Sequence, residues 1–434
     1  MAAPGKDEPE KKEGRDAREL AGAVDDKAEA RKLLADGLYE KCRDRLTTYW
    51  SKHPFDFEAI ELYRDMLVEI GRTDIAEKFD ALLQKRASSL STPPYKHHQE
   101  LYDMAYALVD IRQYAIAAML LKELTRELPE DMEINYELGF ALMSLKSYEE
   151  AIKHFSVAAR KKDDFDPYLN LAICYTLLRN LEAASKAIDI AAPLATNEDE
   201  KLEIEHRRIV LKRLKLFTAK KELNNRDWLF ILYGTVLLRP TLKIQHLKEE
   251  ASHVASMLVV LKGFLTGLSI ENEGVEYYSL RSKPLSSVLA QLNNIPVDAY
   301  RGPDRPENVM LTLSWTTDII GPHQAFIGNA ENRSLFAYAL TPDTPLPLVP
   351  DIIGCLAEDI TMPWEGDKSP KALERLVENI LERAYALEAS PELIQEYQEA
   401  IDYYHDKRDL LVFNNSQIFP NRPEYTAEVP RHGK

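Results

Sequence analysis

The stretch Met132–Phe165, MEINYELGFALMSLKSYEEAIKHFSVAARKKDDF, decides the fold of the first half of the chain. Apolar residues recur three and four positions apart on both sides of a short polar turn at residues 145–148, which predicts two successive helices. The small residues Gly139, Ala151 and Ala158 fall where the two helices must approach closely. The stretch therefore predicts a helical hairpin.

The same pattern occurs in neighbouring stretches, with a repeat length of roughly 34 residues. The equivalent residues are Met104–Ala105 with Ala117, Leu121 and Leu124; Leu138–Gly139 with Ala151, Phe155 and Ala158; and Leu171–Ala172 with Ala184, Ile188 and Ala191. Two degenerate units precede them, one carrying Cys42, Leu46, Tyr49 and Pro54 and the next Leu62, Met66, Ile75 and Phe79. We therefore expect a row of helical hairpins.

This repeat resembles the tetratricopeptide repeat (TPR) family, whose signature places Trp, Leu, Gly, Tyr, Ala, Phe, Ala and Pro at fixed offsets. Met132–Phe165 fits best, with Leu138, Gly139 and Phe155 in place and Asn135 where the family has Trp. The resemblance covers residues 30–193, a little over a third of the chain. It implies an all-α superhelix that binds other proteins.

The resemblance also implies a concave groove lined by the first helix of each hairpin. On that pattern the partner-binding residues are Tyr102, Asp103, Tyr106, Tyr136, Glu137, Phe140, Asn170 and Ile173. Family members that grip a carboxylate use Lys, Arg and Asn there, and only Asn170 matches, so we expect no carboxylate clamp. Aromatic and acidic side chains favour a neutral or basic peptide or amphipathic helix.

Composition limits the classes of partner. The 434 residues carry 55 Lys and Arg against 71 Asp and Glu, a formal charge of −16, which is the wrong sign for nucleic acid or an anionic membrane. The longest charge-free apolar run, Trp228–Leu238, is too short to cross a bilayer. Residues 1–16 are highly charged and lack the apolar segment of a signal peptide, so we expect a cytoplasmic protein. Cys42, Cys174 and Cys355 are interpreted as reduced core residues.

The second half of the chain has a different pattern. Fifteen of the 24 prolines follow residue 270, which excludes further helical hairpins. We expect helices over 198–223, 247–268 and 285–292, strands over 275–280, 309–315 and 334–340, an extended stretch over 341–350 and a helix or turn over 352–356. The alternation of strands and helices predicts a small, partly parallel sheet.

One segment of this half resembles phosphoribosyltransferases. The strand at 275–280, the loop Arg281-Ser282-Lys283-Pro284 and the following helix are similar to the pyrophosphate-binding loop of that family. The acidic pair that would hold the ribose is missing, because Thr312, Leu313 and Ser314 occupy its place. The resemblance therefore implies at most a degenerate module.

Two helices should close the fold. Ser369-Pro370 and Ser390-Pro391 each supply a cap and a first-turn proline, and an apolar stripe follows each of them. The predicted fold class is α+β and multidomain. Its parts are a charged, disordered tail over 1–29, a TPR-like domain over 30–225, an α/β domain over 226–366, a C-terminal helical hairpin over 367–412 and an extended tail over 413–434.

The favoured function is a non-enzymatic interaction scaffold or adaptor, with no catalytic residues, cofactor or metal. One alternative is an enzyme that uses Arg281, Lys283, Asp318 and His323, provided that they converge in one cleft. The other is a chaperone of the secretion type that holds a client helix in the hairpins.

Overall fold

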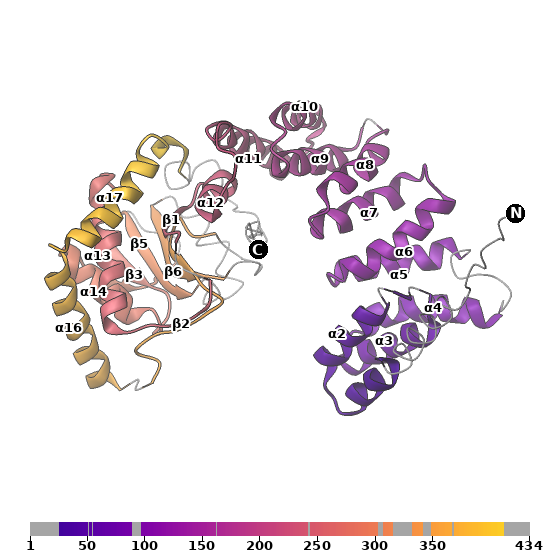
Figure 1. The fold of residues 1–434 in the computed structure, drawn as a ribbon, viewed down its shortest axis with the longest axis horizontal. Helices are drawn as coiled ribbons and strands as arrows, with labels where there is room; N and C mark the ends of the chain where they lie inside the picture. The colour runs from indigo at the N-terminus through magenta and orange to yellow at the C-terminus, as the bar shows by residue number, and fades with distance from the viewer. Residues whose placement is uncertain are drawn as a thin grey trace, which may run out of the picture. The chain divides into compact units, whose positions relative to one another are not determined.

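The computed structural model describes residues 26–411, except residues 51, 54, 89–96, 162, 242–243, 303–306, 316–331, 342–348 and 367–368. The chain divides into two compact units, Met1–Ala195 and Thr196–Lys434. Figure 1 shows the helices and strands of both units. The predicted tails over 1–29 and 413–434 lie almost wholly outside the described residues.

The first unit consists of antiparallel helical pairs. A helix over 26–35 is the first member of the first pair, and the Cys42 thiol of the next helix donates to its Ala30 carbonyl (3.3 Å). The helices that follow are α2 (Tyr39–Trp50), α3 (Phe57–Glu69), α4 (Thr73–Ser88), α5 (His98–Asp110), α6 (Tyr114–Glu127), α7 (Met132–Ser144), α8 (Tyr148–Ala158), α9 (Phe165–Leu177) and α10 (Leu181–Ala191). Each helix packs on the next, and α7 also touches α5 and α9. The unit is therefore a TPR-like helical repeat, as predicted.

The turns inside the pairs repeat as regularly as the helices. Arg112, Lys146 and Arg179 all adopt a left-handed backbone with φ near 60°, and they recur at the same spacing as the apolar residues. Gly37 and Gly71 take the same region in the two degenerate units, again one repeat length apart. This conformation is costly for a residue with a Cβ atom, so its recurrence marks one turn geometry in all five pairs.

The best-fitting hairpin shows why the small residues are needed. A Cβ atom on Gly139 would lie 2.8 Å from Cδ1 of the Phe155 ring on α8. Asn135, which replaces the family's Trp, is buried, and its amide donates to the carbonyls of Pro129 (3.1 Å) and Asp131 (2.7 Å). Its Oδ1 lies 2.8 Å from Nδ1 of His154 on α8. A polar group therefore joins the two helices where the family uses an indole.

The second unit is an α/β domain. Its helices are α11 (Glu198–Lys215), α12 (Asn225–Tyr233), α13 (Ala251–Gly267), α14 (Lys283–Asn293), α16 (Pro370–Leu387) and α17 (Pro391–His405). Its strands are β1 (Val236–Arg239), β2 (His246–Lys248), β3 (Gly274–Tyr277), β4 (Val297–Ala299), β5 (Val309–Trp315), β6 (Arg333–Leu340), β7 (Ile352–Leu356) and β8 (Asp359–Thr361).

The strands form a six-stranded sheet of order β1-β7-β6-β5-β3-β4 and a separate pair β2-β8. Every described pairing is parallel. The chain runs outward from β3 to β4 and returns to the other side of β3 at β5. The direction of winding therefore reverses between β3 and β5, which is the position where open parallel sheets usually hold ligands, beside their carboxyl ends.

Two sequence predictions in this unit are wrong. Residues 352–356, predicted as a helix or turn, form the buried central strand β7. A short apolar run without alternation cannot distinguish a buried parallel strand from a helix, and the β-branched Ile352 and Ile353 favoured the strand. The helix predicted from residue 247 begins at Ala251, because His246–Lys248 pairs with β8. The extended stretch predicted over 341–350 lies mostly outside the described residues.

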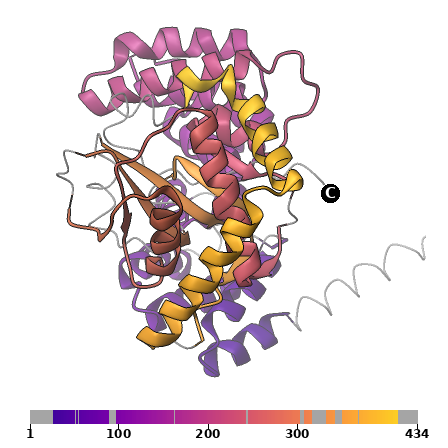
Figure 2. The ribbon, with the colours of Figure 1, turned by 90° about the vertical axis from the view of Figure 1, so that its left-hand side faces the viewer.

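The C-terminal helices are present where the serine-proline pairs predicted them. Ser390 Oγ accepts a hydrogen bond from the backbone N–H of Leu393 (3.4 Å), which caps α17. Both helices pack against α13, and α16 also packs against α14 (Figure 2). Their apolar stripes are therefore covered by the α/β domain of the same unit.

Two glycines of α13 allow α17 to approach. A Cβ atom added to Gly263 would enter the ring of Tyr397, and one added to Gly267 would collide with Ile401. Their spacing of four residues places both glycines on one face of α13. This face is therefore fitted to α17.

We predict that Gly263→Ala lowers the free energy of unfolding of the second unit by about 1–2 kcal/mol, since the clash with Tyr397 outweighs the better helix propensity of alanine. Urea unfolding followed by hydrogen exchange of the α13 and α17 amides measures the change. Gly366→Ala is the control, because its Cβ meets no atom within 4 Å. Equal stabilities of the two variants would contradict the packing described.

Two further expectations concern the chain as a whole. The thiols of Cys42, Cys174 and Cys355 are free and buried, as interpreted from the sequence. Within the described ranges, each helix is too short or too polar to span a bilayer.

Candidate functional site

A cavity of about 330 Å³ opens between the helices that come first in three successive hairpins, α5, α7 and α9. We call it the Glu137 pocket. Three predicted groove residues line it, namely Tyr102 from α5 and Tyr136 and Glu137 from α7. Its other lining residues are Met132, Glu133, Ala158, Lys161, Asp164, Asp166 and Pro167. It therefore joins side chains from α5, α7, the end of α8 and the start of α9.

The starts of α7 and α9 position most of this lining. Asp131 caps α7 by accepting from the backbone N–H of Ile134 (3.0 Å). Asp164 caps α9 in the same way, accepting from Asp166 (3.4 Å). Because both helices begin with capped acidic turns, Glu133 and Asp166 are held at one end of the groove.

Glu137 is the most unusual group in the pocket. It is only 9% exposed, and the described residues offer its carboxylate no hydrogen bond or ion pair. Burial, with Asp110 and Glu133 nearby, raises the pKa of Glu137 to about 7. Burial and the neighbouring negative charges disfavour the ionised carboxylate, so the site favours a proton or a cation at this group.

Two tyrosines flank this carboxylate. Burial and the charge of Glu137 raise the pKa of Tyr102. The Tyr136 hydroxyl accepts from Nδ2 of Asn170 (3.3 Å), and its ring packs edge-on against Phe155 with centroids 5.9 Å apart. The lining therefore combines neutral, electron-rich rings with negative charge.

The balance of charge in the pocket is negative. Glu133, Glu137, Asp164 and Asp166 stand against the exposed Lys161. Four carboxylates facing one ammonium group create a potential that attracts cations and repels anions. The potential of this lining is unfavourable for the carboxylate group of a ligand.

We predict that Glu137→Gln stabilises the first unit at pH 8 by about 1–2 kcal/mol, less than the full pKa shift because the open pocket screens the charge. The folded-state pKa lies above the ordinary 4.5, so the group's stabilisation is full below that value and is lost as pH rises through about 7. Wild type and variant should therefore have similar stability at pH 4.5.

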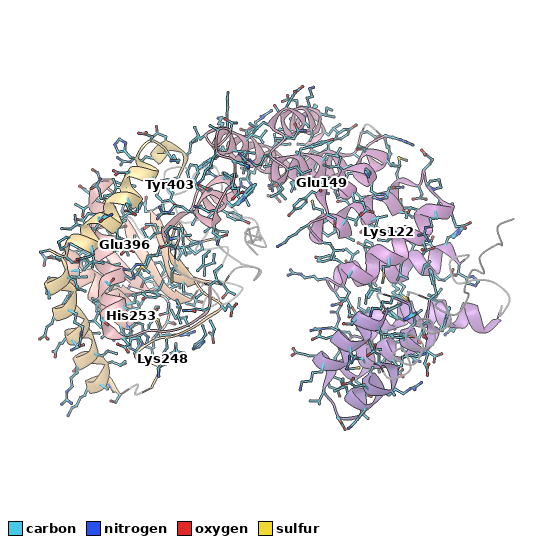
Figure 3. All side chains as sticks on the ribbon, viewed as in Figure 1. Lys122, Glu149, Lys248, His253, Glu396 and Tyr403 are labelled. Atoms are coloured by element: carbon cyan, nitrogen blue, oxygen red, sulfur yellow. The ribbon has the colours of Figure 1, made fainter. Side chains whose placement is uncertain are left out.

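The measurement is urea unfolding between pH 4.5 and 8, followed by hydrogen exchange of the α7 amides. The control is Glu149→Gln, since Glu149 is exposed at the start of α8 (Figure 3). A difference between Glu137→Gln and wild type that does not change with pH would contradict the assignment.

The remaining predicted groove residues lie beside this pocket or pack structurally. The Tyr106 ring lies 6.3 Å from that of Tyr102 and is 45% exposed. Asp103 accepts from Nε2 of Gln99 on its own helix (2.9 Å). Phe140 contacts Tyr114 of α6, with centroids 6.2 Å apart. Asn170 is buried, and Ile173 is half-buried.

Sequence reasoning missed the acidic end of the pocket. Glu133 and Asp166 each lie four residues before a predicted groove residue, Glu137 and Asn170 respectively. They are one repeat length apart, so they occupy equivalent positions of two repeats. Their position, one helical turn before a predicted groove residue in two successive repeats, could have identified them as pocket residues. Lys161 could not be identified in this way, because it comes from the segment after α8.

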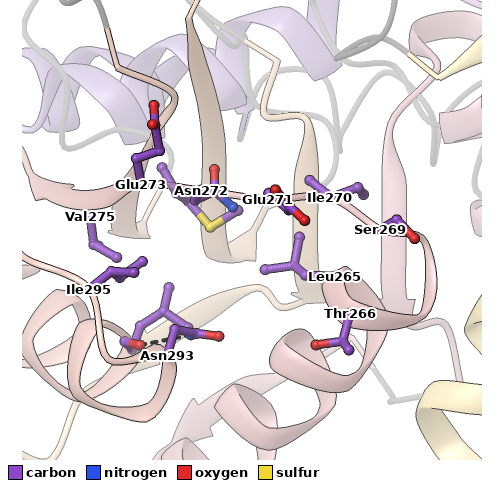
Figure 4. A pocket seen from close by; sticks show the side chains of 12 residues that line it. Leu265, Thr266, Ser269, Ile270, Glu271, Asn272, Glu273, Val275, Asn293 and Ile295 are labelled. Carbon is purple, nitrogen blue, oxygen red and sulfur yellow. Dashed lines mark hydrogen bonds between the residues drawn. The ribbon is translucent and has the colours of Figure 1, made fainter.

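A second cavity, of about 400 Å³, lies in the other unit at the amino ends of β3 and β5 (Figure 4). Several of its polar side chains form hydrogen bonds within the fold. Glu273 accepts from the backbone N–H of Asn308 (2.9 Å), Asn272 accepts from Ser334 (3.3 Å), and Asn293 donates to the carbonyl of Leu289 (2.8 Å). It lies at the edge opposite to the one where parallel sheets bind ligands, so it is a weaker candidate.

Of the four residues of the enzyme alternative, Arg281 and Lys283 lie among the described residues. Arg281 pairs with Glu365 (2.7 Å), and its carbonyl accepts from the indole of Trp364 (2.6 Å). The ammonium group of Lys283 lies over the ring of Tyr277, 5.7 Å from its centre. Asp318 and His323 lie outside the described residues. Among the described residues, no group of three His, Cys, Asp or Glu could hold a metal ion.

Comparison with known proteins gives structural matches. The chain is similar to MamA from Desulfovibrio magneticus RS-1, with 17% identity over 40% of this chain and 94% of that one and a TM-score of 0.25. It is also similar to MamA AMB-1, with 19% identity over 40% of this chain and 98% of that one and a TM-score of 0.25. A third match is YrrB, "a TPR protein with an unusual peptide-binding site". Its identity is 16% over 42% of this chain and 91% of that one, with a TM-score of 0.27. No family model and no curated protein match the chain.

Proposed function

We propose that the first unit binds a segment of another protein in the groove of Tyr102, Asp103, Tyr106, Tyr136, Glu137, Phe140, Asn170 and Ile173. The observation that carries the proposal is the Glu137 pocket, where α5 and α7 bring two tyrosines and a largely buried glutamate to one cavity. The protein then acts as an interaction scaffold or adaptor. A TPR-like repeat favours this class of function over catalysis, because its helices offer an extended surface.

The aromatic side chains supply contact area for such a segment. Tyr106 is nearly half exposed beside Tyr102. Tyrosines bury large area at small entropic cost, and they are enriched among the residues that dominate interfaces. The exposed rings therefore favour a partner that covers them.

The charges define the kind of partner. Asp103 lies on the same helix as the two tyrosines, and four carboxylates line the adjoining pocket. An acidic partner would be repelled. The partner segment is therefore a neutral or basic peptide, or an amphipathic helix of that character.

Selection from a displayed library of random 12-residue peptides tests the proposal, with the full chain immobilised. Peptides enriched on the wild type should bind at least tenfold more weakly to the double variant Asp103→Lys, Tyr106→Ala, because it reverses one charge and removes an exposed ring. The matched control is Tyr385→Ala, since Tyr385 is 51% exposed on α16 of the other unit. Retained binding to the double variant would overturn the groove assignment.

A further inference from the structure

The Glu137 pocket has a more specific chemistry than the groove around it. Glu137 is nine-tenths buried, lines the cavity, and has no hydrogen-bond or ion-pair partner among the described residues. A largely buried carboxylate is unfavourable without a counter-charge, so its position in the wall of a cavity points to a ligand that supplies that charge.

We infer that the Glu137 pocket binds one cationic side chain, the ammonium group of a lysine or the guanidinium group of an arginine, from the bound protein segment. The inference rests on the proposed function and deepens it, since it names the residue that anchors the segment. Lysine and arginine share the positive charge and differ in shape, and the test compares them.

The electrostatics of the lining support a cation. Glu133 and Glu137 lie one helical turn apart on α7, and Asp164 and Asp166 face the same cavity from the start of α9. Within the described residues these carboxylates form no group that could coordinate a metal ion. Spread negative charge of this kind suits a delocalised or flexibly placed organic cation.

The tyrosines and the size of the pocket support a single side chain. Tyr102 and Tyr136 both line the cavity beside Glu137, so their rings can contact the cation or its aliphatic stem. A volume of about 330 Å³ lies at the lower limit of ligand pockets, which suits one long side chain. Lys161 is exposed and also lines the cavity, so its ammonium group can compete with the ligand.

Binding of a cation should also depend on pH. Burial raises the pKa of Glu137 to about 7, so the carboxylate must lose a proton before it pairs with the cation, and affinity should fall roughly tenfold from pH 8 to pH 6. The other titratable groups around it are Tyr102 and Asp110 of α5, Asp131, Glu133 and Tyr136 at α7, Lys161 after α8, and Asp164 and Asp166 at α9.

Methyl NMR of the full chain, labelled at its methionine ε-methyl groups, tests the inference. Met132 lines the pocket and is 39% exposed, so its signal reports on occupancy. The probes are N-acetyl-arginine amide, N-acetyl-lysine amide and, as the uncharged analogue of arginine, N-acetyl-citrulline amide. We expect saturable shifts of the Met132 signal with one or both cations and at least tenfold weaker binding of citrulline.

The variants separate charge from fold. Glu137→Gln should weaken binding of the cations at least fivefold, Glu149→Gln should leave it unchanged, and Lys161→Met should not weaken it. Citrulline binding as tightly as arginine, absence of any saturable shift, or unchanged affinity in Glu137→Gln would each overturn the inference. The citrulline comparison is made on the wild type, so it decides the question even if a variant misfolds.

The outcomes also separate this inference from the proposed function. Selected peptides that need Asp103 and Tyr106 but contain no essential Lys or Arg would refute the cation pocket and leave the groove intact. Cation binding that depends on Glu137, without any peptide sensitive to the groove variant, would refute the groove and leave the pocket.

Discussion

Arg333→Met is expected to lower the free energy of unfolding of the second unit by about 3–5 kcal/mol, because it leaves a buried carboxylate without its cation. Arg333 at the start of β6 donates from Nε to Oε2 of Glu276 on β3 (3.0 Å), across the intervening strand β5. Both side chains are at most 1% exposed. No other buried pair described in this unit is so completely removed from solvent.

The surroundings of the Glu276–Arg333 pair explain why breaking it lowers the free energy of unfolding. Arg333 Nη2 donates to the carbonyl of Gly302 (2.7 Å), and the guanidinium lies over the ring of Tyr300, 4.9 Å from its centre. The neighbouring core consists of Leu311, Leu313, Leu335 and Ala337. Without Arg333 the Glu276 carboxylate would lose its ion pair among these apolar groups and could not be hydrated in its place.

Urea unfolding followed by hydrogen exchange of the β3, β5 and β6 amides measures this effect. The double variant Glu276→Leu, Arg333→Met is the control, because replacing both partners with apolar groups should recover most of the loss. A single variant as stable as the wild type would show that the pair is solvated in solution and that the buried arrangement is wrong.

Asp227→Ala is expected to cost the second unit about 3 kcal/mol, since it removes a helix cap and the three hydrogen bonds that this buried carboxylate accepts. Asp227 is fully buried at the start of α12. Its carboxylate accepts from the backbone N–H of Asn224 (2.7 Å), from Lys220 (2.6 Å) and from the hydroxyl of Tyr403 on α17 (2.7 Å). The group therefore fixes α12 and the C-terminal helix together.

Differential scanning calorimetry of the full chain measures this change, and the transition of the second unit should shift to lower temperature. Tyr403→Phe removes one of the three partners and should cost about 1 kcal/mol. Asp402→Ala is the neighbouring control, since Asp402 is exposed and accepts from Gln398 on the same helix (2.8 Å). Equal losses in Asp227→Ala and Asp402→Ala would contradict the buried network.

The repeat could be predicted from sequence because its signal is periodic. The left-handed turns at Arg112, Lys146 and Arg179 recur at the spacings that aligned the apolar residues, and Gly139 meets Phe155 as its small size indicated. Each hairpin is formed by contacts close in sequence. Contacts between residues close in sequence can be predicted from the periodicity of a single sequence.

The α/β unit was less accessible for the opposite reason. Its strand order depends on pairings between distant segments, such as β1 with β7, and on short strands such as β4 that carry little pattern of their own. The Glu276–Arg333 pair joins residues 57 positions apart, and no local feature of either residue indicates the other. The strand order and the ion pair depend on contacts between distant segments and not on the local propensity of each residue.

The candidate site was predicted in part. Tyr102, Tyr136 and Glu137 were identified because the resemblance places the inner face on the first helices, and the structure brings these three to one pocket. The acids at the starts of α7 and α9 were overlooked because acidic first turns are common helix caps. Their convergence depends on how successive hairpins stack.

The central claim is that the aromatic and acidic inner face of the repeat is the surface that holds a partner segment. Photo-crosslinking tests it most directly, with p-benzoylphenylalanine in place of Tyr106 and a peptide selected on the wild-type chain. We predict a covalent adduct of the peptide at position 106 and none when the same group replaces Tyr385. Adducts at position 385 alone, or none at position 106 under saturating peptide, would contradict the claim.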